Sequence, residues 1–454
     1  MIDVKQMGIA ADKTADAAPV LKQLLARLIR EDPVETLYFS SGTYLIGEDV
    51  HIPLSMDLVL EPGAVLYVAE GVSLRIEAHI DAGLEQIFDG PGLVEGFFNN
   101  SRIYPQWYGA KGDGKHDDTA AFRAAVRNGC EIAVPYTADG YVLGGLELTE
   151  RKYLYGCDEK PSVIVAREDC KDLFTVKAPH VKVEHLRLEM GKTGESACFY
   201  FECLPGQPIS HAKVRDIETH FAWHAVRDAR KNKNEDKVYI TNTVVEDLRC
   251  YNSRSTAVRV KNFWGFIFFR DLLLDNRGLL ATGVANGDYP AFELEDNEGA
   301  ILQRIRIFGT GKAANENEHG FHYVSNVATW MDDCSAREVG GSGLKTVGEN
   351  YHLYFSNTCF SDVGGYGMEM HNNFYPQMNE LTATNCAAGA FLADNVMEAQ
   401  LNALTSQNCG TAVRMSQCHH CAVTRLDPGK DIPVQADDLS VKNVIHLKKP
   451  ELDR

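Results

Sequence analysis

A repeat of short alternating segments in the C-terminal half constrains the fold of this chain most. From position 321 onward the segments begin at 321, 344, 368, 391 and 413, so their starts differ by 23, 24, 23 and 22 residues. Apolar–polar alternation with a period of two is typical of a half-buried β-strand. Units of this length made only of strands and turns predict rungs of a parallel β-helix, an all-β fold. The segments are FELEDN from Phe292, FHYVSN from Phe321, LKTVGE from Leu344, MEMHNN from Met368, FLADNV from Phe391 and VRMSQC from Val413.

The same register extends backward to segments that begin at Phe199, Val226 and Val258. The steps from 226 to 258, 292 and 321 are longer, at 32, 34 and 29 residues. The additional residues are polar or glycine-rich inserts at 231–237, 283–288 and 312–319. Because loops on a rigid scaffold commonly carry function, we expect these inserts to form the walls of a cleft.

A glycine-rich turn and a helix signal precede the repeats, within residues 106–126. Asp117-Asp118-Thr119 supplies N-cap residues, and Phe122, Ala125 and Val126 form one apolar face of the following helix. We expect this helix to cap the open end of the coil, where it would shield apolar side chains and edge strands.

These residues also carry a family resemblance. Tyr108–Gly114 (YGAKGDG), followed by Asp117–Phe122 (DDTAAF), resembles the entry motif of the pectate-lyase-like right-handed parallel β-helix superfamily. That superfamily includes phage tailspike depolymerases and bacterial polysaccharide-degrading enzymes. The resemblance covers about residues 102–430, and a weaker copy of the motif opens the chain. It implies a right-handed, single-stranded parallel β-helix with an N-terminal capping helix. We therefore expect a β-rich leader domain at 1–100, a β-helix catalytic domain at 101–436 and a C-terminal strand or tail at 437–454.

Stacking the leading segments places their second and fourth residues in two outward columns. Successive rungs lie about 4.8 Å apart, and residues i and i+2 of one strand about 6.6–6.8 Å apart. Glu293 and Glu295 are thus expected side by side, with Arg259 and Lys261 one rung before them and His322 one rung after.

Two carboxylates at this separation are what a glycosidase requires, because one must be protonated and the other ionised. Mutual repulsion is expected to separate their pKa values. The predicted catalytic residues are Glu293, Glu295 and His322. The predicted substrate-binding residues are Arg227, Arg259, Lys261, Tyr289, Lys345, Glu369 and His371. A charged column can equally be a solvated surface ladder in which cross-strand pairs stabilise the sheet.

The favoured function is an endo-glycoside hydrolase with a polysaccharide or oligosaccharide as substrate. One alternative is a lyase, in which Arg259 or Lys261 neutralises a uronate and His322 or Lys345 removes the C5 proton. An intramolecular glycosyl transferase and a noncatalytic glycan-binding spike or adhesin also remain open. The choice rests partly on analogy, because this fold hosts many activities.

The composition of the chain limits the classes of partner that it is expected to bind. The 454 residues carry a formal charge of −18, which disfavours nucleic-acid binding, and no apolar run of about 20 residues predicts a membrane span. We expect no cofactor and no metal. The twelve cysteines lack a framework-like spacing, so we expect buried free thiols made in a reducing compartment.

Three further expectations concern location, assembly and turns. No secretory signal is visible at the N-terminus, so we expect synthesis in the cytoplasm, with the protein virion-associated or exported by another route. The family resemblance implies a homotrimer. A turn-stabilising asparagine ladder is expected from Asn262, Asn297, Asn326, Asn372 and Asn395.

Overall fold

The computed structural model describes most of the chain, and its residues fall into two compact units. The described residues are 1–31, 34–190, 196–203, 207–228, 238–261, 263–279, 289–313, 315–438, 440 and 442–447. The first unit comprises Met1–Arg167 with Lys182–Leu186, and the second comprises Glu168–Val181 with Arg187–Arg454. The boundary expected at residue 100 lies inside the first unit and stays a prediction, although the strands before and after it belong to different sheets.

The N-terminal part of the first unit is itself a short parallel solenoid, which the sequence pattern did not anticipate. Leu37 pairs with Leu58 and Leu58 with Ile80, so successive turns lie in register with their leucines and isoleucine buried. Its strands form three parallel sheets: β1 (Ile2–Asp3), β3 (Glu35–Phe39), β6 (Met56–Leu60) and β9 (His79–Asp81); β2 (Asp12–Asp16), β4 (Gly42–Ile46), β7 (Ala64–Val68) and β10 (Phe88–Asp89); and β5 (Val50–Ile52), β8 (Ser73–Ile76) and β11 (Leu93–Glu95).

The described residues of this unit include two α-helices. The first, α1 (Ala18–Glu31), buries four leucines spaced along one face and contacts β5. The second, α2 (Thr119–Asn128), lies where the sequence predicts it, with Phe122 and Ala125 fully buried. It contacts β11, β15 (Leu146–Leu148) and the short helix η2 (Pro105–Tyr108), while its role in capping a coil stays a prediction. A second short helix, η1, spans Val4–Met7.

The cap of α2 corrects one expectation from the sequence. Asp117 accepts a hydrogen bond from the backbone N–H of Thr119 (3.0 Å), whereas the Asp118 side chain makes no capping hydrogen bond to the helix. The buried Asp118 carboxylate instead accepts from the N–H groups of Lys111 (2.7 Å) and Gly112 (3.2 Å). Asp118 therefore fixes the glycine-rich loop. The remaining strands of this unit are β12 (Asp113–Asp117), β13 (Glu131–Val134), β14 (Gly140–Leu143), β16 (Tyr153–Gly156) and β17 (Ser162–Ala166), and β19 (Lys182–Glu189) carries residues of both units.

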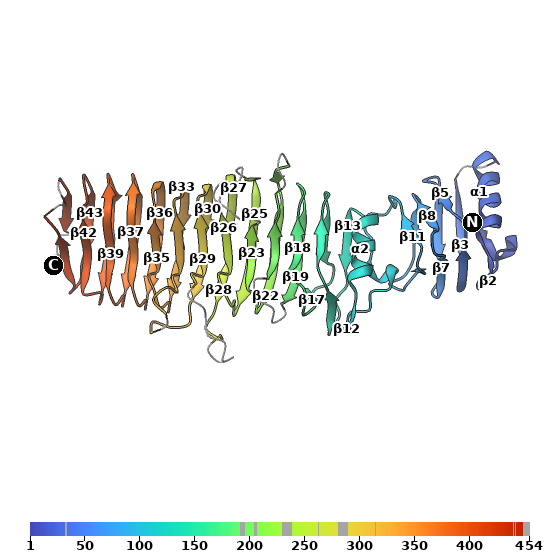
Figure 1. The fold of residues 1–454 in the computed structure, drawn as a ribbon, viewed down its shortest axis with the longest axis horizontal. Helices are drawn as coiled ribbons and strands as arrows, with labels where there is room; N and C mark the ends of the chain where they lie inside the picture. The colour runs from blue at the N-terminus through green and yellow to red at the C-terminus, as the bar shows by residue number, and fades with distance from the viewer. Residues whose placement is uncertain are drawn as a thin grey trace, which may run out of the picture. The chain divides into compact units, whose positions relative to one another are not determined.

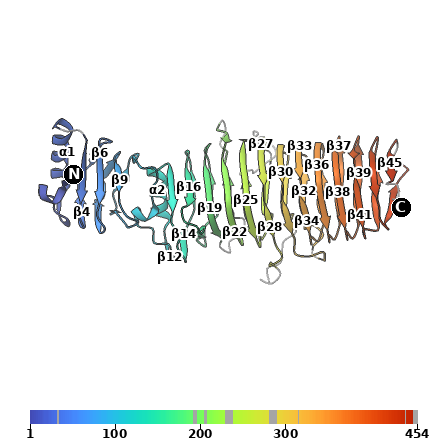
Figure 2. The ribbon, with the colours of Figure 1, turned by 180° about the vertical axis from the view of Figure 1, so that it is seen from behind.

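The second unit is a parallel β-helix whose rungs run side by side (Figures 1 and 2). Each full rung crosses three faces, which we name leading, middle and trailing in chain order. The leading face consists of β18 (Asp172–Val176), β20 (Ala197–Phe201), β23 (His224–Asp228), β26 (Val258–Lys261), β29 (Phe292–Glu295), β32 (Phe321–Val324), β35 (Leu344–Val347), β37 (Tyr366–Phe374), β39 (Gly389–Met397), β42 (Thr411–Ser416) and β44 (Ile432–Ala436).

The other two faces share several long strands. The middle face contains β22 (Lys213–His220), β25 (Thr243–Tyr251), β27 (Phe263–Arg270), β30 (Glu298–Gln303), β33 (Val327–Asp332), β36 (Asn350–Ser361), β38 (Gln377–Thr384), β40 (Gln400–Leu401), β43 (Ala422–Asp427) and β45 (Val444–Leu447). The trailing face contains β28 (Leu273–Asp275), β31 (Arg306–Phe308), β34 (Ser335–Arg337), β41 (Leu404–Gln407) and the ends of β25, β36, β38 and β43. Two short strands, β21 (Ile209–Ser210) and β24 (Val238–Thr241), pair beside them.

The observed register confirms the stacking predicted from the sequence. Phe292 pairs with Phe321, Phe321 with Leu344, and Leu344 with Met368, and all four are fully buried. Side chains at odd positions of these strands fill the interior and those at even positions face outward, as the alternation requires. The predicted all-β parallel β-helix is therefore confirmed.

A single left-handed residue turns the chain at the corner between the middle and trailing faces. L-residues pay a steric cost for positive φ, and asparagine and aspartate tolerate it best. Six such corner residues have φ between 48° and 63°, and four of the six are aspartate or asparagine. They are Asp247, Asp271, Arg304, Asp333, Asn357 and Glu380.

The asparagine ladder exists, but in part with other members than predicted. Asn297 and Asn326 are buried, and each backbone N–H bonds the next side chain: Asn297 N donates to Asn326 Oδ1 (3.1 Å) and Asn326 N to Asn350 Oδ1 (2.9 Å). Asn372 and Asn395 instead occupy left-handed corners and bond one another, because their buried neighbours fill the interior position. Asn262 lies outside the described residues.

The inserts and cysteines complete the comparison with the sequence. Residues 231–237 and 283–288 lie outside the described residues, so their role as cleft walls stays a prediction. All twelve cysteines are free thiols and eight are buried, but Cys130 is exposed, contrary to expectation. In the predicted tail, β45 pairs with β43.

We predict that Asn326→Ala destabilises the β-helix by about 3 kcal/mol, because two buried backbone groups, Asn297 N–H and Leu294 C=O, lose their partners. The measurement is the shift of the denaturant midpoint. Asn408→Ala, which removes an exposed asparagine that bonds Asn385 (3.2 Å), is the control and should shift it little. Equal shifts would contradict a stabilising role for the buried ladder.

Candidate functional site

The leading face brings together five of the predicted site residues in a first cluster on β26, β29 and β32. Arg259 pairs with Glu293 and Glu293 with His322, while Lys261 pairs with Glu295. Glu293 Oε2 lies 3.0 Å from Arg259 Nε and 4.0 Å from Lys261 Nζ, and Glu293 Oε1 lies 3.4 Å from His322 Nδ1. Lys261 also forms an ion pair with Glu295. The two carboxylates therefore share one ammonium group.

The electrostatics of this cluster keep Glu293 ionised. Burial by itself raises the pKa of its carboxyl, but the His322 hydrogen bond and the charges of Lys261 and Arg259 outweigh it, so the pKa is lowered. Glu293 thus lacks the raised pKa of a proton donor. Burial also lowers the pKa of Lys261, against the opposing effect of Glu293. The expectation that repulsion separates the pKa values of Glu293 and Glu295 stays a prediction.

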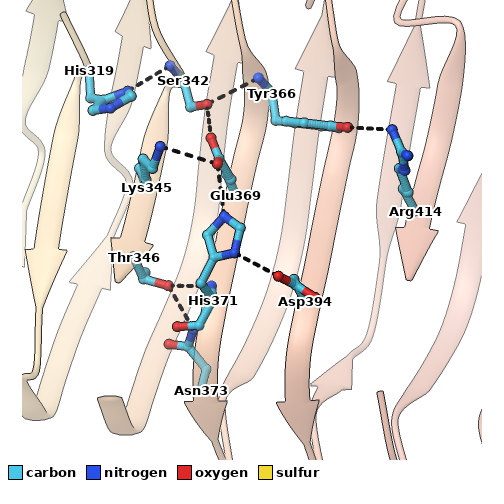
Figure 3. A network of polar contacts seen from close by, with 10 residues as sticks. All are labelled: His319, Ser342, Lys345, Thr346, Tyr366, Glu369, His371, Asn373, Asp394 and Arg414. Carbon is cyan, nitrogen blue, oxygen red and sulfur yellow. Dashed lines mark hydrogen bonds and ion pairs between the residues drawn. The ribbon is translucent and has the colours of Figure 1, made fainter. Parts of the chain in front are cut away.

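A second cluster lies further along the same face, on β35, β37 and β39 (Figure 3). Glu369 Oε1 lies 3.3 Å from Lys345 Nζ and 2.8 Å from His371 Nε2, and His371 Nδ1 lies 3.1 Å from Asp394 Oδ2. Both ring nitrogens of His371 therefore face carboxylates. The Glu369 hydrogen bond, which outweighs burial, raises the pKa of His371, and the pKa of Glu369 falls to about 2 because bonds from His371 and Ser342 together with nearby charges overcome its burial.

The side chain of Ser342, in the turn before β35, contacts this second cluster. Ser342 Oγ donates to Glu369 Oε2 (2.6 Å) and accepts from the N–H of Tyr366 (3.1 Å). Ser342 N donates to His319 Nδ1 (2.9 Å), so the proton of neutral His319 lies on Nε2. Burial lowers the pKa of His319 to about 3, which keeps it neutral. Figure 3 also shows Arg414 donating to Tyr366 Oη (3.3 Å).

The remaining predicted residues lie apart from these contacts. Arg227 forms an ion pair with Asp172 (2.8 Å) and lies 4.6 Å from the Tyr200 ring, so its charge is already satisfied by the protein. Tyr289 is 42% exposed and lies edge-to-face with Trp223 at 6.3 Å. Its role as a platform for a sugar ring stays a prediction.

The two clusters cannot act on one bond together. Three rung spacings separate Glu293 from Glu369, which is about 14 Å. That distance exceeds the separation of about 6.5–9.5 Å between the carboxyl groups of inverting glycosidases. Glu369 and His371 therefore form a cluster separate from that of Glu293 on the same face.

Sequence reasoning missed the groups that position the second cluster. His319 and Ser342 lie in turns, outside the stacked strands, and Asp394 stood in the fourth-position column without an assigned partner. A serine within the glycine-rich run 340–343 was the available signal for Ser342.

In the part of the chain that the structure describes, no three His, Cys, Asp or Glu side chains are grouped as metal ligands would be. Among the same residues, no helix has the length and apolarity to cross a bilayer.

Comparisons with known proteins give structural likeness only. No protein-family model matches the chain, and no curated protein matches its sequence. Similar solved structures include the catalytic domain of a GH87 α-1,3-glucanase in complex with nigerose (8% identity, TM-score 0.47, 76% of this chain and 67% of that chain). The Agl-KA catalytic domain is also similar (10%, 0.42, 98% and 68%), as is the A-module of mannuronan C-5 epimerase AlgE6 from Azotobacter vinelandii (11%, 0.39, 77% and 100%). At these identities the likeness concerns the fold alone.

We predict that Glu369→Gln lowers the pKa of His371 toward or below its ordinary 6.5, because it removes the main group that stabilises the imidazolium. A raised folded-state pKa stabilises the protein below pH 6.5, and that contribution is lost as pH rises through the folded pKa. The wild-type protein should therefore become less stable as the pH rises from below 6.5 through the folded-state pKa of His371. The stability of the variant should fall less over the same pH range.

Histidine-selective NMR titration measures the pKa, and denaturant midpoints on both sides of pH 6.5 measure the stability. Glu298→Gln, an exposed change on the middle face, is the control. An unchanged His371 titration in Glu369→Gln would contradict the assigned contact.

Proposed function

We propose that this chain is a carbohydrate-active enzyme that cleaves a polysaccharide at the first cluster of the leading face. The observation that carries the proposal is the environment of Glu293. Its carboxylate is ionised, held by groups from both neighbouring rungs, yet 14% exposed. A fixed carboxylate beside a second one is the functional core of a glycoside hydrolase.

Hydrolysis assigns different roles to the two carboxylates. Glu293, which stays ionised, activates water or attacks the anomeric carbon. Glu295 donates the proton to the leaving oxygen. In the free protein Lys261 holds Glu295 by an ion pair. A sugar that displaces Lys261 removes this positive charge and desolvates the carboxyl, and both changes raise its pKa.

We predict that Glu293→Gln and Glu295→Gln each lower kcat by about 100-fold or more, the range expected when an acid or base is removed. Mass spectrometry of products from a panel of bacterial, plant and microbial polysaccharides provides the measurement. Glu298→Gln removes an exposed carboxylate of the same rung outside the cluster and should retain full activity. Unchanged cleavage in both cluster variants would refute the site.

A β-elimination on a uronate is the second candidate, favoured by the pairing of His322 with Glu293. With Nδ1 directed at Glu293 (3.4 Å), His322 Nε2 remains to accept the C5 proton. Arg259, whose side chain is 42% exposed, would neutralise the uronate carboxylate.

The two chemistries give different products on the same polyuronate. Elimination should yield unsaturated ends that absorb ultraviolet light, whereas hydrolysis should yield new reducing ends without that absorbance. We expect the hydrolytic pattern. Ultraviolet-absorbing ends that disappear in His322→Gln would replace hydrolysis with elimination, and binding without any cleavage would identify a noncatalytic adhesin.

Assembly and location are also proposals. We propose a homotrimer, made in the cytoplasm and then virion-associated or exported by another route. Light scattering of the purified full chain tests the trimer, and a monomer would refute it.

A further inference from the structure

The outward side chains of the middle face change in character along the rungs. One column reads Phe268, Ile301, Trp330 and Tyr354 and then continues as Gln377 and Gln400 in the same register. The Trp330 and Tyr354 rings stack in parallel, with centroids 5.3 Å apart and planes 7° apart. A half-exposed aromatic platform therefore gives way to side-chain amides.

A neighbouring column, two residues further along each strand, forms a polar hollow. Ser356 follows Tyr354 on β36 by two residues, so both project from the same side of the strand about 6.8 Å apart. The hollow has a volume of about 510 Å³ and adjoins a second hollow of about 260 Å³ that shares Glu380 and Arg425. We name the first the amide hollow, and its lining residues are Ser356, Asn357, Asn379, Glu380, Asn402, Thr424 and Arg425.

Hydrogen-bonding capacity in the amide hollow is only partly used by the protein. Asn402 Nδ2 donates to Asn379 Oδ1, and Thr424 Oγ1 donates to Asn402 O (2.7 Å). Within the described residues, Asn379 Nδ2 and Asn402 Oδ1 have no protein partner, and both side chains are exposed. The hollow thus offers both donors and acceptors to a ligand.

The charge of the hollow differs from that of the leading face. Its lining carries one carboxylate, Glu380, and one guanidinium, Arg425, against five neutral polar side chains. Hydroxyl groups, which both donate and accept, match such amides without any net charge. Aromatic rings beside the amides suit the apolar faces of pyranose rings, and polar groups that recur every rung, about 4.8 Å apart, suit a linear polymer.

We propose that the amide hollow, with Trp330 and Tyr354 beside it, is a binding site for an uncharged stretch of polysaccharide. This site lies on the middle face, on different side chains from the charged clusters of the leading face. It binds sugar without taking part in bond cleavage. The proposal does not depend on the reaction assigned to Glu293.

Asparagine pairs between rungs also occur outside the linings of these two hollows, and they supply a matched control. Asn408 Nδ2 donates to Asn385 Oδ1 (3.2 Å) 23 residues apart, at the same spacing as Asn379 and Asn402. Removing Asn408 disturbs an equivalent ladder without touching the amide hollow.

The test measures binding of the full chain to soluble neutral glucans, galactans and mannans and to polygalacturonate and alginate by affinity electrophoresis. We expect at least one neutral polysaccharide in the gel to retard the protein. Its binding to Asn379→Ala/Asn402→Ala should be about ten-fold weaker, since two hydrogen bonds are lost. Tyr354→Ala should weaken it similarly, whereas Asn408→Ala should bind as wild type. Thermal unfolding of each variant establishes that it is folded.

Three results would overturn the proposal: no neutral polysaccharide retards the protein, Asn379→Ala/Asn402→Ala binds as wild type, or Asn408→Ala weakens binding equally. Retardation lost only in Glu293→Gln would assign the bound sugar to the leading face instead. Neutral binding by a wild-type chain that cleaves no polysaccharide in the panel would refute the reaction proposed for Glu293 and leave the amide hollow in place.

Discussion

The parallel pairing of successive rungs in one register is the constraint on which every other feature of the second unit depends. Because strand residues alternate between interior and surface, a slip of one residue would bury the charges and expose the phenylalanines. The buried column through Phe292, Phe321, Leu344 and Met368 prevents that slip. Once the register of the interior is fixed, it also determines which outward residues lie next to one another on adjacent rungs.

The fixed register explains why Glu293 and Glu369 on the leading face are ionised. Glu293 lies between Arg259 and His322 because their rungs are adjacent, and Glu369 lies beside Lys345 for the same reason. Burial favours the neutral carboxyl, yet hydrogen bonds and nearby positive charges together lower the pKa of both Glu293 and Glu369. Charge compensation of this kind stabilises a sheet modestly on its own. In the proposed reaction a ligand replaces one of the cations, and Lys261 is the cation that two carboxylates share.

The sequence predicted what periodicity determines and missed what single contacts determine. The rungs, the inward phenylalanines and the vertical neighbours of Glu293 follow from alternation and spacing. The return of Asp118 to the glycine-rich loop does not, since a carboxylate before a helix is equally suited to cap it. The contacts of His319 and Ser342 were not predicted for a related reason. Both residues lie in turns, and the period of two describes only strands. The leader solenoid escaped because its short strands carry few turn signals beyond the glycines.

The two outward faces differ in what they ask of a ligand, although the same rungs build both. Glu369 on the leading face and Asn379 on the middle face belong to one turn of chain, joined through the buried Asn373. Interior packing therefore fixes both faces together, while their exposed side chains can change independently. On the leading face every described carboxylate of the clusters has a cationic neighbour, so a ligand must compete with an existing partner. On the middle face Asn379 and Asn402 still offer a donor and an acceptor, so a neutral sugar needs to displace only water.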